Sequence, residues 1–270
     1  MRANEEELAM ALRGGLRGRF QSSFHLLENA FEVLSDQMMH SITPTQYETM
    51  RPLFDQIHEQ LVLLRRLGEH SADAAVAPVL QQVCVPRPME LVGQLREWCA
   101  LFNEIAVQEQ LEARARVETD GDTVLLTMGD DTLLNGLLAN LLSNSLAAGR
   151  HVQITLVCGD GTFCYRDDGP GLPEDARALL NEGQWSERLL QQGGLGLPLI
   201  RAYAAAMGWQ LTARDGTGTD LCFSLPGCTV DMGEMVLESA RIAPQVRQQQ
   251  RAYLQRELYP VLQKKNDPAE

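Results

Sequence analysis

The chain has 270 residues, of which 44% are hydrophobic, and a formal net charge of −13 at neutral pH. This length suits one large domain or two small ones, and the composition is that of a soluble globular protein. A nucleic-acid-binding surface is disfavoured, because phosphate contacts need clustered Lys and Arg. No apolar run reaches the roughly 20 residues of a membrane helix, and the N-terminus lacks a signal-peptide core. We therefore expect a cytoplasmic chain without a membrane segment, or the cytoplasmic part of a membrane receptor.

Two long helices are predicted at the N-terminus. Apolar side chains recur every three or four residues from Leu8 to Met38, and a second stripe runs from Tyr47 to Leu67. The segment around Pro44 is predicted to be a turn, and Pro52 either kinks the second helix or starts it. Because a single hairpin leaves an apolar face uncovered, we expect two copies to pair as a four-helix bundle. The alternative is that the hairpin packs on the second domain of its own chain.

The rest of the chain alternates helical and strand patterns. Residues 71–88 are Ala-rich with three prolines, which favours a linker ending in an extended segment. A helix is expected from about Met89 to Gln108, followed by a strand pair around Asp120-Gly121. Further along, two hairpins (151–169 and 210–226) flank an irregular stretch (172–192) and a helix (197–207). This order predicts a layer of helices over a mixed or antiparallel sheet, an α/β sandwich.

The six cysteines show neither C-x-x-C pairing nor metal-like spacing with the five histidines. Most lie in apolar runs, where Cys behaves as a small hydrophobic residue. We therefore expect no structural disulfide and no zinc site.

Three polar motifs follow one another between residues 130 and 226. Asn140 and Asn144 are one helical turn apart, so both amides emerge on one face of a Leu-rich helix. Asn is unfavourable inside helices, which favours a binding role over a capped or solvent-facing pair. An Asp-x-Gly-x-Gly turn comes directly after a strand, and its glycines allow a tight turn. A glycine-rich loop then opens a helix whose N-terminal N–H groups suit an anion, and a Gly-Thr pair follows. The residues of the turn are Asp167, Gly169 and Gly171. The loop contains Gly193, Gly194 and Gly196 and leads into Leu197, and the final pair is Gly218 and Thr219.

In this order the motifs resemble the nucleotide-binding domain of sensor histidine kinases, which belongs to the wider family of gyrase, Hsp90 and MutL. The resemblance implies ATP and Mg²⁺ as cofactors. Asp167 would accept a hydrogen bond from the adenine amino group, and Asn144 would coordinate Mg²⁺ on the phosphates with support from Asn140. The glycine loop and Leu197 would hold the phosphates, residues 172–192 would form the lid, and Thr219 would close the pocket. Asn at position 140 replaces the Glu general base of the ATP-hydrolysing members, which favours the histidine kinase branch.

Some positions depart from the family pattern. Gln192 replaces the first glycine of the loop. Ala147 stands where the family has a Lys or Arg that contacts phosphate, so this contact is missing unless Arg150 reaches the site. The glycine pair usual after the second helix is here Gly208-Trp209. These departures are expected to weaken nucleotide binding and phosphoryl transfer.

The phosphoacceptor is the least regular part of the resemblance. The best match to the family's acceptor motif places Met10 where His should be and Ala11 where its acidic partner should be. Met has no nitrogen to phosphorylate. The rival acceptor is His25, which lacks an acidic residue directly after it and could equally be a partly buried core histidine. His40, His58 and His70 are weaker candidates.

The overall prediction is an α+β protein with four parts: a dimerising helical hairpin (1–75), a linker (76–86), an ATP-binding α/β sandwich (87–227) and a helical tail (228–270) without an assigned role. The predicted function is the ATP-binding core of a two-component sensor histidine kinase, working as a homodimer with a response regulator. The alternative is a catalytically degenerate pseudokinase that binds nucleotide, dimerises and signals by conformation alone.

Overall fold

The computed structural model describes residues 2–120, 124–149, 151–192, 194–228 and 244–266. The chain divides into two compact units, Met1–Val76 and Ala77–Glu270, and each is described by itself. The predicted fold class is confirmed: a helical hairpin precedes an α/β domain with a mixed sheet.

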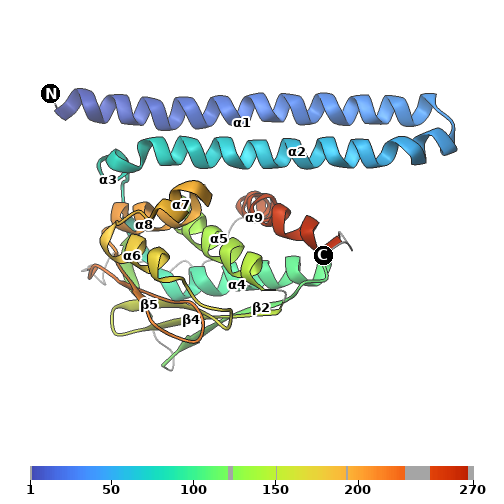
Figure 1. Cartoon of the computed structure of the whole chain (residues 1–270). Helices are drawn as coiled ribbons and strands as arrows, with labels where there is room; N and C mark the ends of the chain where they lie inside the picture. The colour runs from blue at the N-terminus through green and yellow to red at the C-terminus, as the bar shows by residue number, and fades with distance from the viewer. Residues whose placement is uncertain (1, 121–123, 150, 193, 229–243, 267–270) are drawn as a thin grey trace. The chain divides into compact units, whose positions relative to one another are not determined.

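The first unit is a hairpin of two long helices, α1 (Arg2–Ser41) and α2 (Pro44–Val76) (Figure 1). The second helix begins with a reciprocal cap, in which the Thr43 N–H donates to Gln46 Oε1 and the Gln46 N–H donates to Thr43 Oγ1. Pro44 follows as the first helical residue, where its missing N–H costs nothing. Pro52 lies inside α2, so the helix starts before this proline.

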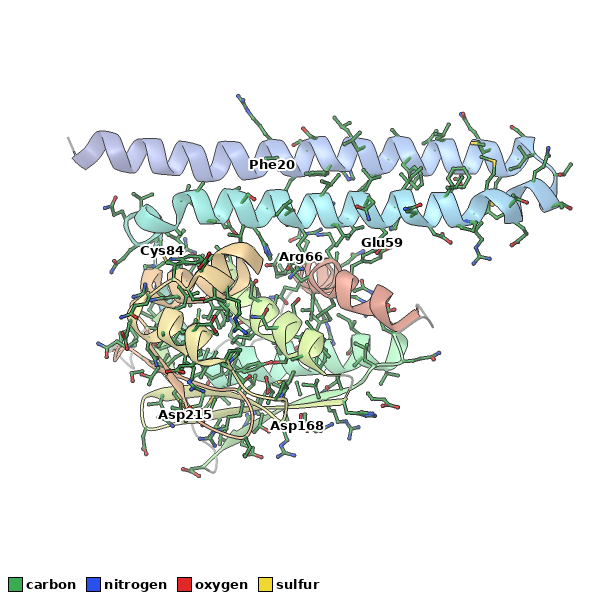
Figure 2. The ribbon with its side chains drawn as sticks, viewed as in Figure 1. Phe20, Glu59, Arg66, Cys84, Asp168 and Asp215 are labelled. Atoms are coloured by element: carbon green, nitrogen blue, oxygen red, sulfur yellow. A yellow bond between two sulfur atoms is a disulfide. The ribbon has the colours of Figure 1, made fainter. Side chains whose placement is uncertain are left out.

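Aromatic and charged side chains join the two helices of the hairpin. The rings of Phe31 and Phe54 lie 5.9 Å apart. Phe20, on the side of α1 that faces α2, packs against Gly68 together with Phe24 (Figure 2). An ion pair links Arg65 Nη1 to Glu28 Oε2 at 2.6 Å. The described part of the predicted stripe is therefore divided: its phenylalanines pack between the two helices, whereas several of its aliphatic side chains are exposed. Between 47% and 57% of each of the following side chains is exposed: Leu27, Leu34, Ile57, Leu64 and Leu67.

The second unit is built on a five-stranded sheet with the order β2-β4-β5-β7-β6. Strands β2 and β4 are parallel, and every other neighbouring pair is antiparallel. The two predicted hairpins, β4–β5 and β6–β7, are confirmed. The strands are β2 (Glu112–Thr119), β4 (His151–Gly159), β5 (Thr162–Asp167), β6 (Gln210–Arg214) and β7 (Asp220–Ser224).

Helices cover one face of this sheet (Figure 1). Helices α4 (Leu91–Gln108), α5 (Asp131–Ala148) and α8 (Gly196–Ala206) form this layer. The Glu90 carboxylate caps α4, and Asp130 Oδ1 caps α5 by accepting from Thr132 and Leu133 N–H. The core lies between the layers, where Phe163 stacks on Phe223 with ring centroids 5.3 Å apart. No described helix of this unit lies against the opposite face of the sheet.

Several local predictions were wrong. The strands on either side of Asp120-Gly121 do not pair with each other: β2 pairs with β4, and β3 (Leu126–Gly129) pairs with β1 (Arg87–Glu90). The expected linker is largely helical, because α2 runs to Val76 and is followed by η1 (Ala77–Val79) and α3 (Leu80–Val83). Leu80 is fully buried, so apolar packing stabilises this short helix.

The stretch from 172 to 192 is also more regular than expected. It contains α6 (Glu174–Glu182) and α7 (Glu187–Gln192). Helix α6 buries Leu179 and Leu180 and ends at Gly183, whose φ of 75° permits the left-handed cap. The helical period was missed because both helices are short and largely polar.

The expectation of no disulfide was wrong as well. Cys164 and Cys222 are bonded to each other, 58 residues apart in sequence. Cys99, Cys158 and Cys228, which also lie in the described part of the chain, are not in this bond. The pairing follows from the register of β5 and β7, which spacing along the sequence does not reveal.

The predicted helical tail contains α9 (Pro244–Asn266), which packs against α5 and α4. Arg247 Nη2 lies 2.5 Å from Glu104 Oε1, and Arg251 bonds to Gln108. Leu254 and Leu258 are buried. Residues 229–243 of this segment lie outside the described part of the chain.

Candidate nucleotide-binding site

The two asparagines of α5 face the start of α8. Asn140 is 1% exposed, and its Nδ2 donates to the Gly136 carbonyl at 2.8 Å. Its Oδ1 is the one buried side-chain nitrogen or oxygen atom in the described part of the chain that has no hydrogen-bond partner. Asn144, one turn further along, is exposed. An amide oxygen that is buried without a partner marks a place where a water, ion or ligand belongs.

Gly196 lies against both carboxamides. A Cβ atom at position 196 would stand 3.1 Å from Asn140 Oδ1 and 3.5 Å from Asn144 Oδ1. The missing side chain therefore keeps a small space open between the first turn of α8 and the polar face of α5. Amide oxygens are suitable ligands for a hard cation such as Mg²⁺, and helix N-terminal N–H groups suit phosphate. The residues present thus fit Mg²⁺ bound to a phosphate.

Asp167, at the end of β5, is held by hydrogen bonds from three sides. Its Oδ1 accepts from the backbone N–H of Gly169 and of Thr219, each at 3.0 Å, and its Oδ2 accepts from Ser145 Oγ at 2.5 Å. A carboxylate offers about four lone pairs, so these bonds leave one acceptor position, on Oδ2. Asp167 is fixed in place yet can still accept one hydrogen bond from a ligand.

Ser145 and Tyr165 complete this arrangement, and the sequence analysis missed both. Tyr165 OH lies 2.8 Å from Ser145 Oγ. Burial raises the pKa of Tyr165, so its hydroxyl stays protonated at neutral pH. Ser145 Oγ is placed to donate to Asp167 Oδ2 at 2.5 Å or to the Leu141 carbonyl at 3.2 Å, and in either case the protonated Tyr165 hydroxyl can donate to Ser145. Ser145 directly follows Asn144, and this adjacency was the one signal available in the sequence.

The glycines around Asp167 allow two backbone segments to approach closely. Gly171 has a φ of 81°, a conformation that favours glycine. A Cβ at Gly218 would stand only 1.9 Å from the Asp167 carbonyl oxygen, so no other residue fits there without a backbone shift. The Asp-x-Gly-x-Gly turn and the Gly-Thr pair are thus parts of one compact structure. Asp167, Gly169, Gly171 and Thr219 come together as the sequence predicts.

The other predicted site residues are less closely joined. Gly194 is exposed with no atom within 4 Å of an added Cβ, and Leu197 lies in the first turn of α8. Gly193, Arg150 and the side chain of Gln192 lie outside the described residues. The side chains of Met10 and Ala11 are not described either, although both positions fall within α1.

His25 lies on the exposed surface of α1. Its Nε2 is 3.3 Å from Asn29 Nδ2, which can donate to the ring in the tautomer that carries its proton on Nδ1. In the single chain it is therefore not a buried histidine. The contact with Asn29 was not predicted from the sequence.

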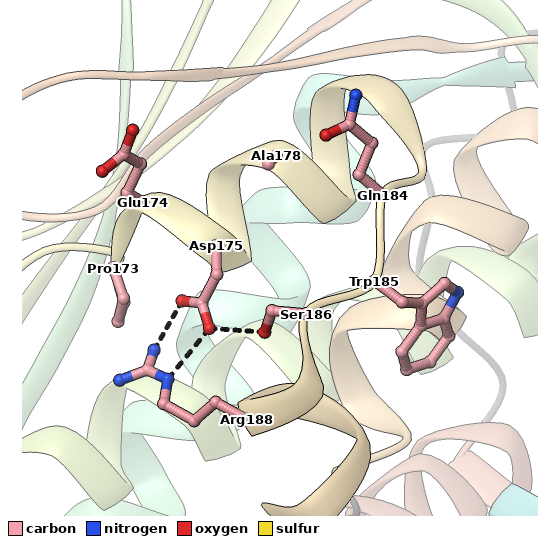
Figure 3. A pocket seen from close by; sticks show the side chains of 8 residues that line it. All are labelled: Pro173, Glu174, Asp175, Ala178, Gln184, Trp185, Ser186 and Arg188. Carbon is pink, nitrogen blue, oxygen red and sulfur yellow. Dashed lines mark hydrogen bonds and ion pairs between the residues drawn. The ribbon is translucent and has the colours of Figure 1, made fainter.

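A separate pocket of about 490 Å³ lies within the predicted lid (Figure 3). Residues of α6 and of the segment leading into α7 line it, and neither asparagine nor Asp167 does. Arg188 bonds to both carboxylate oxygens of Asp175, to Oδ1 at 2.5 Å and to Oδ2 at 2.9 Å. The hydrogen bonds from Arg188 and Ser186 lower the pKa of Asp175, so it remains ionised well into the acid range. This pair joins the two helices of the lid.

The fold and the site agree with one another and with a family match. Residues 129–228 match the family described as histidine kinase-, DNA gyrase B-, and HSP90-like ATPase. Sensor histidine kinases are among the similar proteins. The sensor protein kinase CarS of Pseudomonas aeruginosa is 36% identical over 83 residues, or 29% of this chain and 19% of the relative. The sensor histidine kinase GlrK of Escherichia coli is 25% identical over 217 residues, 72% of this chain and 41% of the relative.

A solved structure shares the two-part fold. The full-length ShkA structure in complex with AMPPNP aligns with a TM-score of 0.53 and 17% identity, covering 77% of this chain and 45% of that one. The chain thus spans less than half the length of CarS, GlrK and the full-length ShkA structure. No helix in the described ranges is both long and apolar enough to cross a membrane.

Proposed function

We propose that the chain is the ATP-binding core of a two-component sensor histidine kinase. In this proposal Asp167 accepts a hydrogen bond from the adenine amino group through the free position on Oδ2, while Gly169, Gly171 and Thr219 shape the pocket around the base. Because GTP carries a carbonyl at that place, a carboxylate acceptor favours ATP. The turn thereby serves as the base-specific part of the site.

The unpartnered Asn140 Oδ1 carries this proposal. It borders a space beside Gly196 that a Cβ would fill, next to Asn144 and the first turn of α8. Asn144 coordinates Mg²⁺ through its amide oxygen with Asn140 in support, and Gly193, Gly194, Gly196 and Leu197 contact the phosphates. The metal, when bound, neutralises phosphate charge. The residues themselves orient the nucleotide and exclude water.

The hairpin supplies dimerisation in this proposal. Its aliphatic stripe is exposed in one chain, and a second copy buries it in a four-helix bundle. His25 is the acceptor candidate, with Asn29 orienting its ring, and a response regulator is the expected partner. We place the chain in the cytoplasm, alone or as part of a membrane receptor.

A second candidate function is a nucleotide-binding pseudokinase. The alignment that puts Met10 and Ala11 at the acceptor motif favours it, and so does Ala147, which removes a phosphate contact. Such a protein would bind ATP, dimerise and signal by a change of conformation without phosphoryl transfer.

Calorimetric titration of the full chain with ATP and Mg²⁺ tests the shared core of both candidates. Gly196→Ala should abolish or strongly weaken binding, because the new methyl group occupies the space in front of Asn140 Oδ1. Gly149→Ala is the matched control, since its added Cβ meets nothing closer than 3.7 Å. Normal ATP affinity in Gly196→Ala would contradict the assignment. Incubation with labelled ATP and an assay for acid-labile phosphate then separates kinase from pseudokinase.

A further inference from the structure

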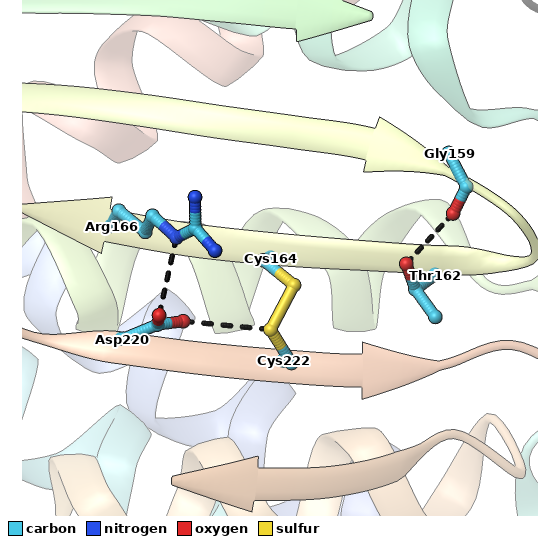
Figure 4. Close-up of a disulfide and its surroundings, with 6 residues drawn as sticks. All are labelled: Gly159, Thr162, Cys164, Arg166, Asp220 and Cys222. Carbon is cyan, nitrogen blue, oxygen red and sulfur yellow. Dashed lines mark hydrogen bonds and ion pairs between the residues drawn. A yellow bond between two sulfur atoms is a disulfide. The ribbon is translucent and has the colours of Figure 1, made fainter. Parts of the chain in front are cut away.

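The disulfide joins β5, the central strand of the sheet, to its neighbour β7. Cys164 of β5 and Cys222 of β7 are directly opposite each other in the antiparallel register (Figure 4). Side chains alternate along a strand, and Phe163 and Tyr165 on either side of Cys164 are buried in the core beneath the helices. The two sulfurs therefore lie on the opposite face of the sheet, which no described helix of the second unit covers.

Other interactions also join the two bonded strands. Small disulfide-dense domains use such bonds in place of a core, but this unit has a large core of its own on the other face. The β5–β7 ladder and the stacked pair of Phe163 and Phe223 connect the same two strands. A disulfide that is added to so many other contacts between two strands suggests a redox task.

The bond is close to the candidate nucleotide site. Three residues after Cys164, β5 ends at Asp167, and three residues before Cys222 lies Thr219. Asp167 and Thr219 exchange two hydrogen bonds: Asp167 N–H to the Thr219 carbonyl, and Thr219 N–H to Asp167 Oδ1. The disulfide thus spans the same two strands whose ends position the base-binding carboxylate.

We propose that Cys164 and Cys222 form a reversible thiol–disulfide site that reacts with small thiols and disulfides of the glutathione class and tunes the affinity of the nucleotide site. The tuning rests on the nucleotide binding proposed above. The closed disulfide fixes the spacing of the strand ends and favours nucleotide binding. Two thiol sulfurs cannot approach as closely as bonded ones, so reduction loosens β5 against β7 beside Asp167.

The reduction is an ordinary two-step exchange. The thiolate of one small thiol attacks a sulfur of the pair, forms a mixed disulfide and expels the other cysteine as a thiolate, which takes a proton. A second small thiol attacks the mixed disulfide, which releases the second cysteine and one molecule of the small disulfide. The protein gains two electrons and two protons, and two small thiols are oxidised. Oxidation is the reverse, with the small disulfide as the oxidant.

A carboxylate beside Cys222 accommodates the reduced state of the pair. Asp220 Oδ1 lies 3.5 Å from Cys222 Sγ, where it can accept the S–H of the reduced form. Only 6% of Cys164 and 4% of Cys222 is exposed, which favours small reactants over protein oxidoreductases. Burial raises the pKa of Cys99 and Cys158 to about 12, so these thiols are unreactive at neutral pH.

Differential alkylation with peptide mass mapping tests the site on the full chain in glutathione buffers of increasing oxidised fraction. As the oxidised fraction rises, we expect Cys164 and Cys222 to lose alkylation together and to appear as a disulfide-linked peptide pair, and the change should reverse when the buffer is reduced again. The alkylation of Cys99 and Cys158 should not change. Asp220→Asn should speed reduction, because removal of the negative charge helps the incoming thiolate and the departing one. Failure of the pair to form a bond, or to be reduced while the chain is folded, would overturn the proposal. So would stoichiometric Zn²⁺ held by the reduced pair.

Calorimetry with ATP and Mg²⁺ on the oxidised and reduced chain tests the coupling. The reduced form should bind at least about fivefold more weakly, which is the lower end of usual coupling between sites. By reciprocity, saturating nucleotide should protect the disulfide from reduction by the same factor.

In the double variant Cys164→Ser/Cys222→Ser the affinity for ATP should not respond to the redox buffer, whereas Cys228→Ser should behave as the natural chain does. Equal affinity in both states overturns the coupling. No ATP binding in either state, with reversible alkylation intact, overturns the proposed function and the coupling but leaves the redox site.

Discussion

Asp167 and Thr219 bind each other reciprocally, the backbone of each donating to an oxygen of the other at 3.0 Å. Hydrogen bonds from Thr219, Gly169 and Ser145 together occupy all but one acceptor position of the Asp167 carboxylate. The direction of the remaining position is therefore fixed before a ligand arrives. Such preorganisation lowers the cost of binding.

The first prediction concerns base selectivity. Asp167→Asn should weaken ATP binding by about 1.5–3 kcal/mol, the contribution of a hydrogen bond to a charged group, and should narrow the preference for ATP over GTP. Calorimetry with both nucleotides measures this. Asp168→Asn is the control, because Asp168 accepts from the backbone N–H of Gln153. Equal affinity of the natural chain for ATP and GTP would refute the role of Asp167.

The second prediction concerns the hydrogen-bond chain behind Asp167. Ser145→Ala should destabilise the fold by about 1–3 kcal/mol, because it leaves the buried Tyr165 hydroxyl without its acceptor. Tyr165→Phe removes the same hydroxyl, so the double variant should cost less than the sum of the two single variants. Denaturant unfolding of all four chains measures the coupling. Additive losses would show that the chain of hydrogen bonds does not act as a unit.

The third prediction concerns assembly. The full chain should be a dimer, and removal of residues 1–75 should leave a folded, monomeric α/β domain. Leu27→Lys with Leu34→Lys should dissociate the dimer without unfolding the hairpin, since both side chains are exposed in the single chain. Gln37→Lys on the same helix is the charge control. Sedimentation at tens of micromolar protein measures the oligomeric state of each chain. A monomeric natural chain would mean that the stripe is covered in another way.

The fourth prediction is that autophosphorylation is weak or absent. Met10 lacks a nucleophilic nitrogen, and Ala147 with Gln192 removes contacts that would steady the transferring group, on which phosphoryl transfer largely depends. Met10→His with Ala11→Glu should restore some acid-labile labelling if only the acceptor is missing. Strong labelling of the natural chain that disappears in His25→Gln would instead make His25 the acceptor.

The fifth prediction concerns the pH dependence of the lid. Because the Arg188 hydrogen bonds lower the pKa of Asp175 in the folded chain, their stabilisation is complete above the unfolded Asp value of about 4 and is lost as the pH falls through the lowered value. Trp185 lines the same pocket, and its fluorescence should therefore be constant from pH 8 to about pH 5. Asp175→Asn should shift the emission throughout that range. A transition of the natural chain near pH 6 would argue against the Asp175–Arg188 pair as its cause.

Local signals in the sequence were sufficient for the parts of the site that depend on short spacing. Asn140 and Asn144 share a helix face because of their four-residue separation, and the glycine motifs require their turns. The contacts of Ser145 and Tyr165, the disulfide and the pairing of β1 with β3 could not be predicted. These features depend on strand register and on which residues meet across the sheet, and hydrophobic periodicity carries no such information.

The C-terminal helix α9 also bears on how the protein can be divided. The family match ends at residue 228, yet α9 packs on α4 and α5 and buries Leu254 and Leu258. A fragment cut at the family boundary would therefore expose apolar surface on the helix that carries Asn140 and Asn144, and it should aggregate or lose stability. The compact unit that holds the candidate site therefore extends through α9, so the matched family segment and the structural unit are of different lengths.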